Sequence, residues 1–197
     1  MHEIADWLKG GGFEQYTRCS TKQDSALPSR RTRLGQKAIA EVTSLGDLMG
    51  AVYRLAKPKD ASGLYDIRRR SILELAPPTM PRADAQAWAS QLTLAGMERK
   101  LRKLEVWVAE LDGVIVGWGA IRGDRLEGLY AAPEFAGQGI GAGLLDMLEG
   151  LMRAREFPSV RAEASSNARD FYLRRGYRET GPQTPQGAWP IAKELLT

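Results

Sequence analysis

Residues 129–145 read LYAAPEFAGQGIGAGLL and contain, in order, the end of a strand, a proline-led turn, a cluster of glycines and the start of a helix. Glycines allow successive backbone N–H groups to point into one concavity, and a helix N-terminus adds a partial positive charge. Leucines then recur at helical spacing through residues 141–155, which predicts an amphipathic helix. The stretch therefore predicts a pyrophosphate-binding site that needs no side-chain cation.

Strands and helices are expected on both sides of this stretch. Residues 105–111 and 114–121 are apolar strand-like segments, and Asp112-Gly113 between them is a strong hairpin signal because both turn positions favour positive φ. Further strands are predicted over residues 52–56, 126–130, 159–164, 177–180 and 189–195. Helices are predicted from about residue 60 to 77, over 84–96 with Asp84 as N-cap, over 97–104, and over 168–175 with Gly176 closing the last one.

One interpretation of the glycine cluster is a dinucleotide-binding fold. Gly137, Gly139 and Ala142 match its relaxed fingerprint, and Glu163 lies about twenty residues further on, where that fold places a ribose-binding acid. However, the glycines follow an antiparallel hairpin, and too little chain remains after Glu163 to complete a doubly wound sheet. We therefore keep NAD binding only as the competing hypothesis.

A second interpretation rests on three separated motifs that occur in the same order and spacing as in a known family. They are the hairpin around Asp112-Gly113, the segment Leu129-Tyr130-Ala131-x-Pro133 followed by Gly137-Gln138-Gly139-Ile140-Gly141, and Phe171-Tyr172-x-x-x-Gly176-Tyr177. From about residue 52 to the C-terminus, the chain resembles bacterial members of the GNAT N-acetyltransferase family. The resemblance implies an α/β (α+β) domain over residues 49–197. Its mixed, mostly antiparallel central sheet would splay between strands 4 and 5 and be flanked by helices.

The resemblance also implies a co-substrate, acetyl-CoA, and the residues that bind it. Strand residues would pair with the pantetheine amides, and the glycine loop would hold the pyrophosphate through its backbone. The expected cofactor-binding residues are Leu129, Tyr130, Ala131, Gly137, Gln138, Gly139, Gly141, Ala142 and Ser165. Two positions depart from the family pattern: Ala136 replaces the usual Arg or Gln, and Ser165 replaces a frequent Asn. We expect somewhat weaker cofactor binding as a result.

Direct attack of an amine on a thioester needs a base for the amine and an acid for the leaving thiolate. Tyr172 occupies the position of the family's tyrosine and is the expected acid, while Glu127 is the candidate base. Glu127 lies two residues before Leu129, so strict strand alternation would place both side chains on one face. A water chain could replace Glu127 as the base, and Glu163 is a weaker alternative. A catalytically weak CoA-binding or interaction module remains the second functional hypothesis.

Composition narrows the classes of protein. The chain has 197 residues, of which 43% are hydrophobic and 26% charged, and it contains one cysteine and one histidine. These counts disfavour a disulfide framework, a histidine metal site and Ser-His catalysis. No apolar run approaches the ~20 residues that a membrane helix needs, and no secretory signal is recognisable. We expect a cytoplasmic protein without a metal or a membrane partner.

The basic character of the chain raises the question of its partners. The formal net charge is +4, but no helix carries a continuous basic stripe, so a nucleic-acid partner is not expected. Arg68, Arg69 and Arg70 could recognise an acidic substrate, but a solvated helix face is the favoured interpretation because consecutive residues fan around a helix. The expected acceptor is a small-molecule or peptide amine, and a homodimer is left open. Residues 1–48 have little apolar material and are predicted to form a poorly ordered extension.

Overall fold

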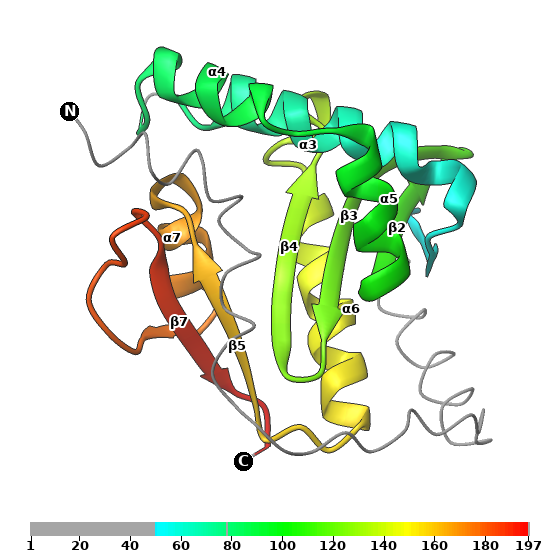
Figure 1. Cartoon of the computed structure of the whole chain (residues 1–197). Helices are drawn as coiled ribbons and strands as arrows, with labels where there is room; N and C mark the ends of the chain where they lie inside the picture. The colour runs from blue at the N-terminus through cyan, green and yellow to red at the C-terminus, as the bar shows by residue number, and fades with distance from the viewer. Residues whose placement is uncertain (1–49, 78, 197) are drawn as a thin grey trace.

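The computed structural model describes residues 50–77 and 79–196, and the prediction for residues 1–48 lies outside this part of the chain. Its centre is a seven-stranded sheet in the order β1-β2-β3-β4-β5-β7-β6. All neighbouring strands run antiparallel except β4 and β5, which are parallel. Helices cover the sheet on both faces (Figure 1). The predicted mixed, mostly antiparallel α/β fold is therefore confirmed, and the doubly wound sheet of a dinucleotide-binding fold is excluded.

The strands are β1 (Val52–Leu55), β2 (Glu105–Leu111), β3 (Val114–Arg122), β4 (Arg125–Ala131), β5 (Ser159–Ala164), β6 (Arg178–Glu179) and β7 (Trp189–Glu194). The helices are α3 (Ala61–Leu75), α4 (Arg82–Ser90), α5 (Leu94–Lys103), α6 (Ile140–Ala154) and α7 (Ser166–Leu173), with short 3-10 helices η3 (Pro58–Asp60) and η4 (Pro133–Phe135). Within the described residues, no helix is both long and apolar enough to span a bilayer.

The hairpin and the helix after the glycines form as predicted. Asp112 and Gly113 have φ values of 50° and 80°, the positive values that a tight turn between two strands requires. The amphipathic helix is α6, whose leucines form the main core with residues of β2, β3 and β5. On the opposite face, Leu64 of α3 and Met97 of α5 pack with Val108 and Trp118 of the sheet.

The helix predicted over residues 84–96 is wrong in its bounds. Helix α4 begins at Arg82 and ends at Ser90, so Asp84 lies in its first turn instead of capping it. A new helix, α5, begins after Thr93, whose Oγ1 accepts a hydrogen bond of 3.0 Å from the Gly96 N–H. Because threonine is favoured at helix N-caps, a second helix starts at this point, and the predicted single helix forms as two.

A glycine allows β1 to pack against α6. Tyr53 of β1 reaches the helix at Gly143, where a Cβ atom would overlap the tyrosine hydroxyl. We expect Gly143→Ala to lower the free energy of unfolding by about 1–3 kcal/mol, as overpacking does in tightly packed sites. Gly141→Ala is the matched control, since a Cβ there meets no atom within 4 Å. Chemical denaturation would measure both variants, and Tyr53→Phe in the Gly143→Ala background should restore part of the loss. Equal stabilities of the two alanine variants would contradict this packing.

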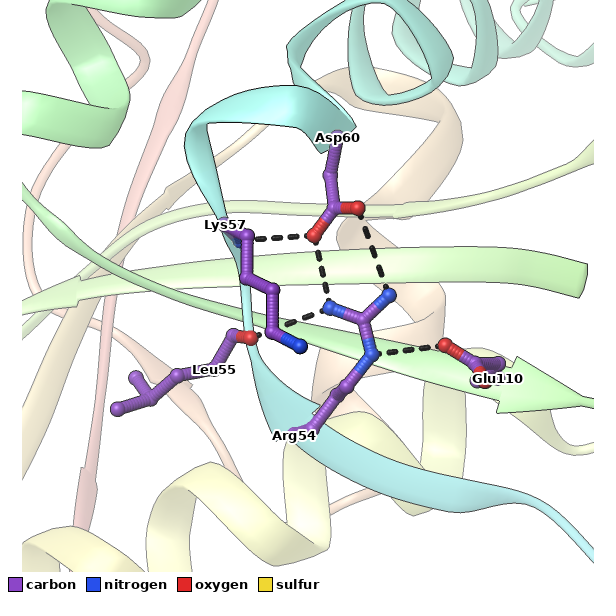
Figure 2. A network of polar contacts seen from close by, with 5 residues as sticks. All are labelled: Arg54, Leu55, Lys57, Asp60 and Glu110. Carbon is purple, nitrogen blue, oxygen red and sulfur yellow. Dashed lines mark hydrogen bonds and ion pairs between the residues drawn. The ribbon is translucent and has the colours of Figure 1, made fainter. Parts of the chain in front are cut away.

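A polar network connects β1 with η3 and β2 (Figure 2). The buried Asp60 carboxylate accepts hydrogen bonds of 2.7 Å from Arg54 Nη1 and 2.7 Å from the Lys57 N–H. The Nε of Arg54 donates to Glu110 of β2, also at 2.7 Å. Burial alone would raise the pKa of Asp60, but the bonds from Arg54 and Lys57 outweigh it, so the pKa lies below its ordinary value. The ionised carboxylate therefore stabilises the fold.

This network predicts a pH-dependent stability. A carboxylate with a lowered pKa contributes stability that is present above its unfolded pKa and is lost as pH falls through its folded value. We expect Asp60→Asn to be less stable by about 1–3 kcal/mol at neutral pH. The difference from the wild type should shrink below about pH 4. Urea denaturation at several pH values would measure it, with Glu110→Gln as a weaker control. A difference that stays constant down to pH 3 would argue against a role for the charge.

Candidate functional site

The sheet opens between its two parallel strands. Strands β4 and β5 pair only through Arg125 with Arg161 and Leu126 with Ala162. Beyond these pairs the strands diverge toward the end of the molecule where α3 and α4 lie (Figure 1). The splay predicted between strands 4 and 5 is thus confirmed, and it exposes one edge of β4 from residue 127 onward.

A β-bulge lies at the point where the strands separate. On β3, the neighbours Ala120 and Ile121 pair with Gly128 and Leu126, so Glu127 has no partner opposite it. Bulges bend a strand and re-aim its side chains, and they are frequent beside active sites. The bulge breaks the strict alternation on which the shared face of Glu127 and Leu129 was predicted, so that reason is wrong. Both residues nevertheless line the same cavity.

A cavity of about 420 Å³ occupies the splay. Its walls come from the loop before α4 and α4 itself, from β4, β5 and α7, and from residues 183–188 between β6 and β7. The cavity therefore brings together segments from both halves of the sheet, and it contains Tyr172, Glu127 and Glu163 in one lining.

Tyr172 is buried and packs edge-to-face on two other aromatic rings. The centroid of its ring lies 5.1 Å from that of Phe171 and 5.2 Å from that of Tyr177. Burial, with a smaller contribution from Tyr130, raises the pKa of Tyr172 well above its ordinary value. The phenol therefore stays protonated at neutral pH, as a proton donor must before it acts.

The two candidate carboxylates form ion pairs. Glu127 is 8% exposed, and its Oε1 lies 2.7 Å from Arg122 Nη2 and 3.9 Å from Arg125 Nε. Glu163 Oε1 lies 3.4 Å from Arg125 Nη2. Arg125 thus connects both carboxylates at the narrow end of the splay. Glu127 is therefore both a cavity residue and an ion-pair partner.

The glycine loop has the geometry of an anion cradle. Gly137 and Gly139 have φ values of 75° and 88°, and Gly139 is the N-cap residue of α6. The Gly143 N–H donates to Gly139 O at 2.8 Å, so the N–H groups of residues 140–142 remain as the free first turn of the helix. A Cβ at Gly137 or Gly141 would meet no atom within 4 Å, which leaves open space in front of the loop. These features fit a pyrophosphate group.

The expected cofactor-binding residues fall into two groups. Leu129, Tyr130 and Ser165 line the cavity, whereas Ala131 and the glycine loop, with Gln138 and Ala142, lie outside its lining. The Gln138 N–H already donates to Phe135 O at 3.3 Å, so it is a weaker ligand candidate than the N–H groups of α6. A long site that runs from the loop into the splay accounts for both groups.

Internal hydrogen bonds occupy two of the predicted contact atoms. The Ala131 carbonyl accepts a hydrogen bond from the Ser71 hydroxyl, which leaves one lone pair of the oxygen for another donor. The Ser165 hydroxyl donates to Asn167 Oδ1 at 2.7 Å. Asn167 also lines the cavity, so Ser165 and Asn167 act as a linked polar pair at the start of α7.

Several lining residues were missed by the sequence reasoning. Asp84 and Trp88 come from α4, and Gln183 and Gln186 from the loop before β7. Asp84 and Trp88 are four residues apart on a helix, so they share one face. The spacing could have predicted that the two side chains lie on one helix face. Nothing in the sequence, however, predicts that this face lies over the splay.

The three consecutive arginines of α3 do not line the cavity. Arg70 forms hydrogen bonds of 3.1 and 2.7 Å with the Glu134 carboxylate of η4, and Arg68 lies over the Tyr130 ring at 5.5 Å from its centroid. Arg69 is exposed. Arg70 therefore anchors the turn before the glycine loop, and the three arginines lie outside the cavity lining.

Comparisons with known proteins agree with this architecture. A family model described as "Acetyltransferase (GNAT) domain" matches residues 76–188. A GCN5-related N-acetyltransferase structure from Rhodopseudomonas palustris is 28% identical, with a TM-score of 0.67 over 73% of this chain and 95% of that chain.

Two more distant structures share the fold, and each of those proteins was solved with coenzyme A or acetyl-CoA. PaiA N-acetyltransferase from Thermoplasma acidophilum, solved with coenzyme A, is 18% identical, with a TM-score of 0.63 over 74% of this chain and 99% of that chain. YncA from Salmonella typhimurium, solved with acetyl-CoA, is 21% identical, with a TM-score of 0.52 over 75% of this chain and 95% of that chain. A comparison with curated proteins finds no match.

Proposed function

Because the chain belongs to the GNAT acetyltransferase family, we propose that it moves the acetyl group of acetyl-CoA to a primary amine by direct attack in a ternary complex. The observation that carries the proposal is the cavity at the β4–β5 splay, together with a glycine loop that follows β4 and has free helix N–H groups. The cavity can hold a thioester and an amine together, and the glycine loop can hold a pyrophosphate.

The residues of the site divide into those that bind and those that move protons. The first-turn N–H groups of α6, with Gly139 and Gly141, would hold the pyrophosphate, while Leu129, Tyr130 and Ser165 would contact the pantetheine arm. No cationic side chain stands at Ala136, so the backbone N–H groups carry the anion binding. Acetyl-CoA supplies the activated acetyl thioester when it is bound.

The proton transfers are assigned to two side chains of the cavity. Glu127 accepts a proton from the attacking ammonium or amine, directly or through one water. Tyr172 donates a hydrogen bond, and then its proton, to the sulfur of the departing thiolate. The position of Tyr172 in the cavity lining supports this role, and the phenol is protonated at neutral pH, as a donor must be.

The proposal is tested by calorimetric titration of the full chain with acetyl-CoA and, separately, with NAD, followed by thiol-release assays with a panel of primary amines. We expect micromolar binding of acetyl-CoA, no signal with NAD, and release of free CoA only when an amine is present. Binding without turnover for any amine would favour a CoA-binding module. Absence of acetyl-CoA binding would refute the enzyme proposal.

A further inference from the structure

The charged and aromatic side chains of the cavity wall limit which amines can serve as the acceptor. We propose that the acceptor is a small organic amine that carries a second positive charge and no carboxylate, and that Asp84 of α4 binds the second charge. This inference rests on the acetyl-transfer function proposed above, and it concerns the part of the cavity between α4 and the splay.

The charged residues of the lining are all of one sign. Among the described residues that line the cavity, Asp84, Glu127 and Glu163 are acidic, and there is no lysine, arginine or histidine. An acceptor with a carboxylate would bury that group without a cationic partner, which is strongly unfavourable. A cationic acceptor instead meets carboxylates on three segments of the wall.

Two of these carboxylates are already neutralised. Arg122 pairs with Glu127 and Arg125 with Glu163, from positions outside the lining. Asp84 differs, because it forms no ion pair with any residue in the described part of the chain. It is half-buried at the cavity wall. Of the three carboxylates, it is the one that no residue of 50–77 or 79–196 neutralises through an ion pair, so a ligand can do so.

Aromatic rings border the same region. Trp88 follows Asp84 by one helical turn and lines the cavity with it, and Tyr130 lines it from β4. The faces of such rings attract organic cations within about 6 Å. Arg68 lies over the Tyr130 ring, and the Asp84 carboxylate is what places a cationic group of the ligand on the α4 side of the wall.

The arrangement suits an organic cation and not a metal ion. Within residues 50–77 and 79–196, no three acidic, cysteine or histidine side chains are grouped closely enough to hold a metal. The carboxylates are instead distributed along the cavity, with Glu127 at the splay and Asp84 on the helix above it. An extended molecule can place its reacting amine near Glu127 and a second cationic group near Asp84.

Three acceptors of equal chain length test the inference: 1,4-diaminobutane, butylamine and 4-aminobutanoate, whose far ends are cationic, neutral and anionic. We expect kcat/KM for the diamine to exceed that for butylamine by about tenfold, the effect of one charge contact near a protein surface. 4-Aminobutanoate should be the poorest acceptor, and added salt should reduce the preference. Asp84→Asn should bring the diamine-to-butylamine ratio close to one. Glu98→Gln removes an exposed carboxylate of α5 outside the lining and should leave the ratio unchanged.

Calorimetric binding of the same three amines and of acetyl-CoA separates the two proposals. If acetyl-CoA binds and butylamine or 4-aminobutanoate is the best acceptor, the cation inference is wrong and the transferase proposal stands. If acetyl-CoA does not bind but the diamine binds in an Asp84-dependent way, the transferase proposal is wrong and the cation site stands. A diamine preference that Asp84→Asn leaves intact overturns the assignment to Asp84.

Discussion

Tyr172→Phe should lower kcat for acetyl transfer by about 10²–10⁴-fold, the range that a positioned acid contributes. The substitution removes only the hydroxyl, and the edge-to-face contacts with Phe171 and Tyr177 remain possible for the phenyl ring. KM for acetyl-CoA should therefore change little. The departing thiolate then has no donor in the cavity wall at this position, and the chemical step slows.

Tyr177→Phe is the matched control for that experiment. Its hydroxyl is also buried, but Tyr177 does not line the cavity. We expect its kcat to stay within about threefold of the wild type, and thermal unfolding would show whether either variant is destabilised. A Tyr172→Phe enzyme with nearly normal kcat, or a Tyr177→Phe enzyme that is equally slow, would contradict the role of Tyr172.

Glu127→Gln is expected to lower kcat by about 10²-fold when the acceptor is protonated in solution. Glutamine keeps the size of the side chain and an oxygen that accepts the hydrogen bond from Arg122, but it cannot take a proton. The loss should become smaller as pH rises, because more of the amine then arrives deprotonated. Steady-state rates from pH 6 to 10 would measure this.

Arg122→Gln distinguishes the base from the ion pair. Arg122 is outside the cavity lining, and its side chain is 56% exposed. If Glu127 acts as a base, removal of its partner should change kcat far less than Glu127→Gln does. Equal losses in the two variants would mean that the ion pair matters for structure, and an unchanged Glu127→Gln rate would point to a water chain as the base.

The sequence was most informative where local chemistry determines the structure. Asp112-Gly113 and the glycine loop before α6 form as predicted, because positive φ and helix initiation are properties of a few adjacent residues. The same reasoning failed at α4. Asp84 looked like a cap, yet Pro81 precedes the first turn and Thr93 caps a separate helix.

Features that depend on long-range contacts were harder to predict from the sequence. The splay could be expected only through the family resemblance, because nothing local in β4 or β5 limits their pairing to two residue pairs. The bulge at Glu127 depends on the register with β3 and was not predicted. Tyr172 and Glu127, the predicted catalytic residues, both line the cavity, whereas the place of Asp84 in the lining depends on α4 lying over the splay.

The two ends of the site are attached to the molecule in different ways. The glycine loop is fixed by its backbone conformation, because Gly137 and Gly139 have positive φ, and most other residues at these two positions would strain the turn into α6. The opposite wall comes from one face of α4, held underneath by Ala85 and Ala89, and from a connecting segment outside the sheet. Substitutions of surface residues on α4 or in this connecting segment usually change the free energy of unfolding by less than about 0.5 kcal/mol. Selection can therefore exchange one acceptor for another during evolution, at little risk to folding and without altering how the acyl donor is held.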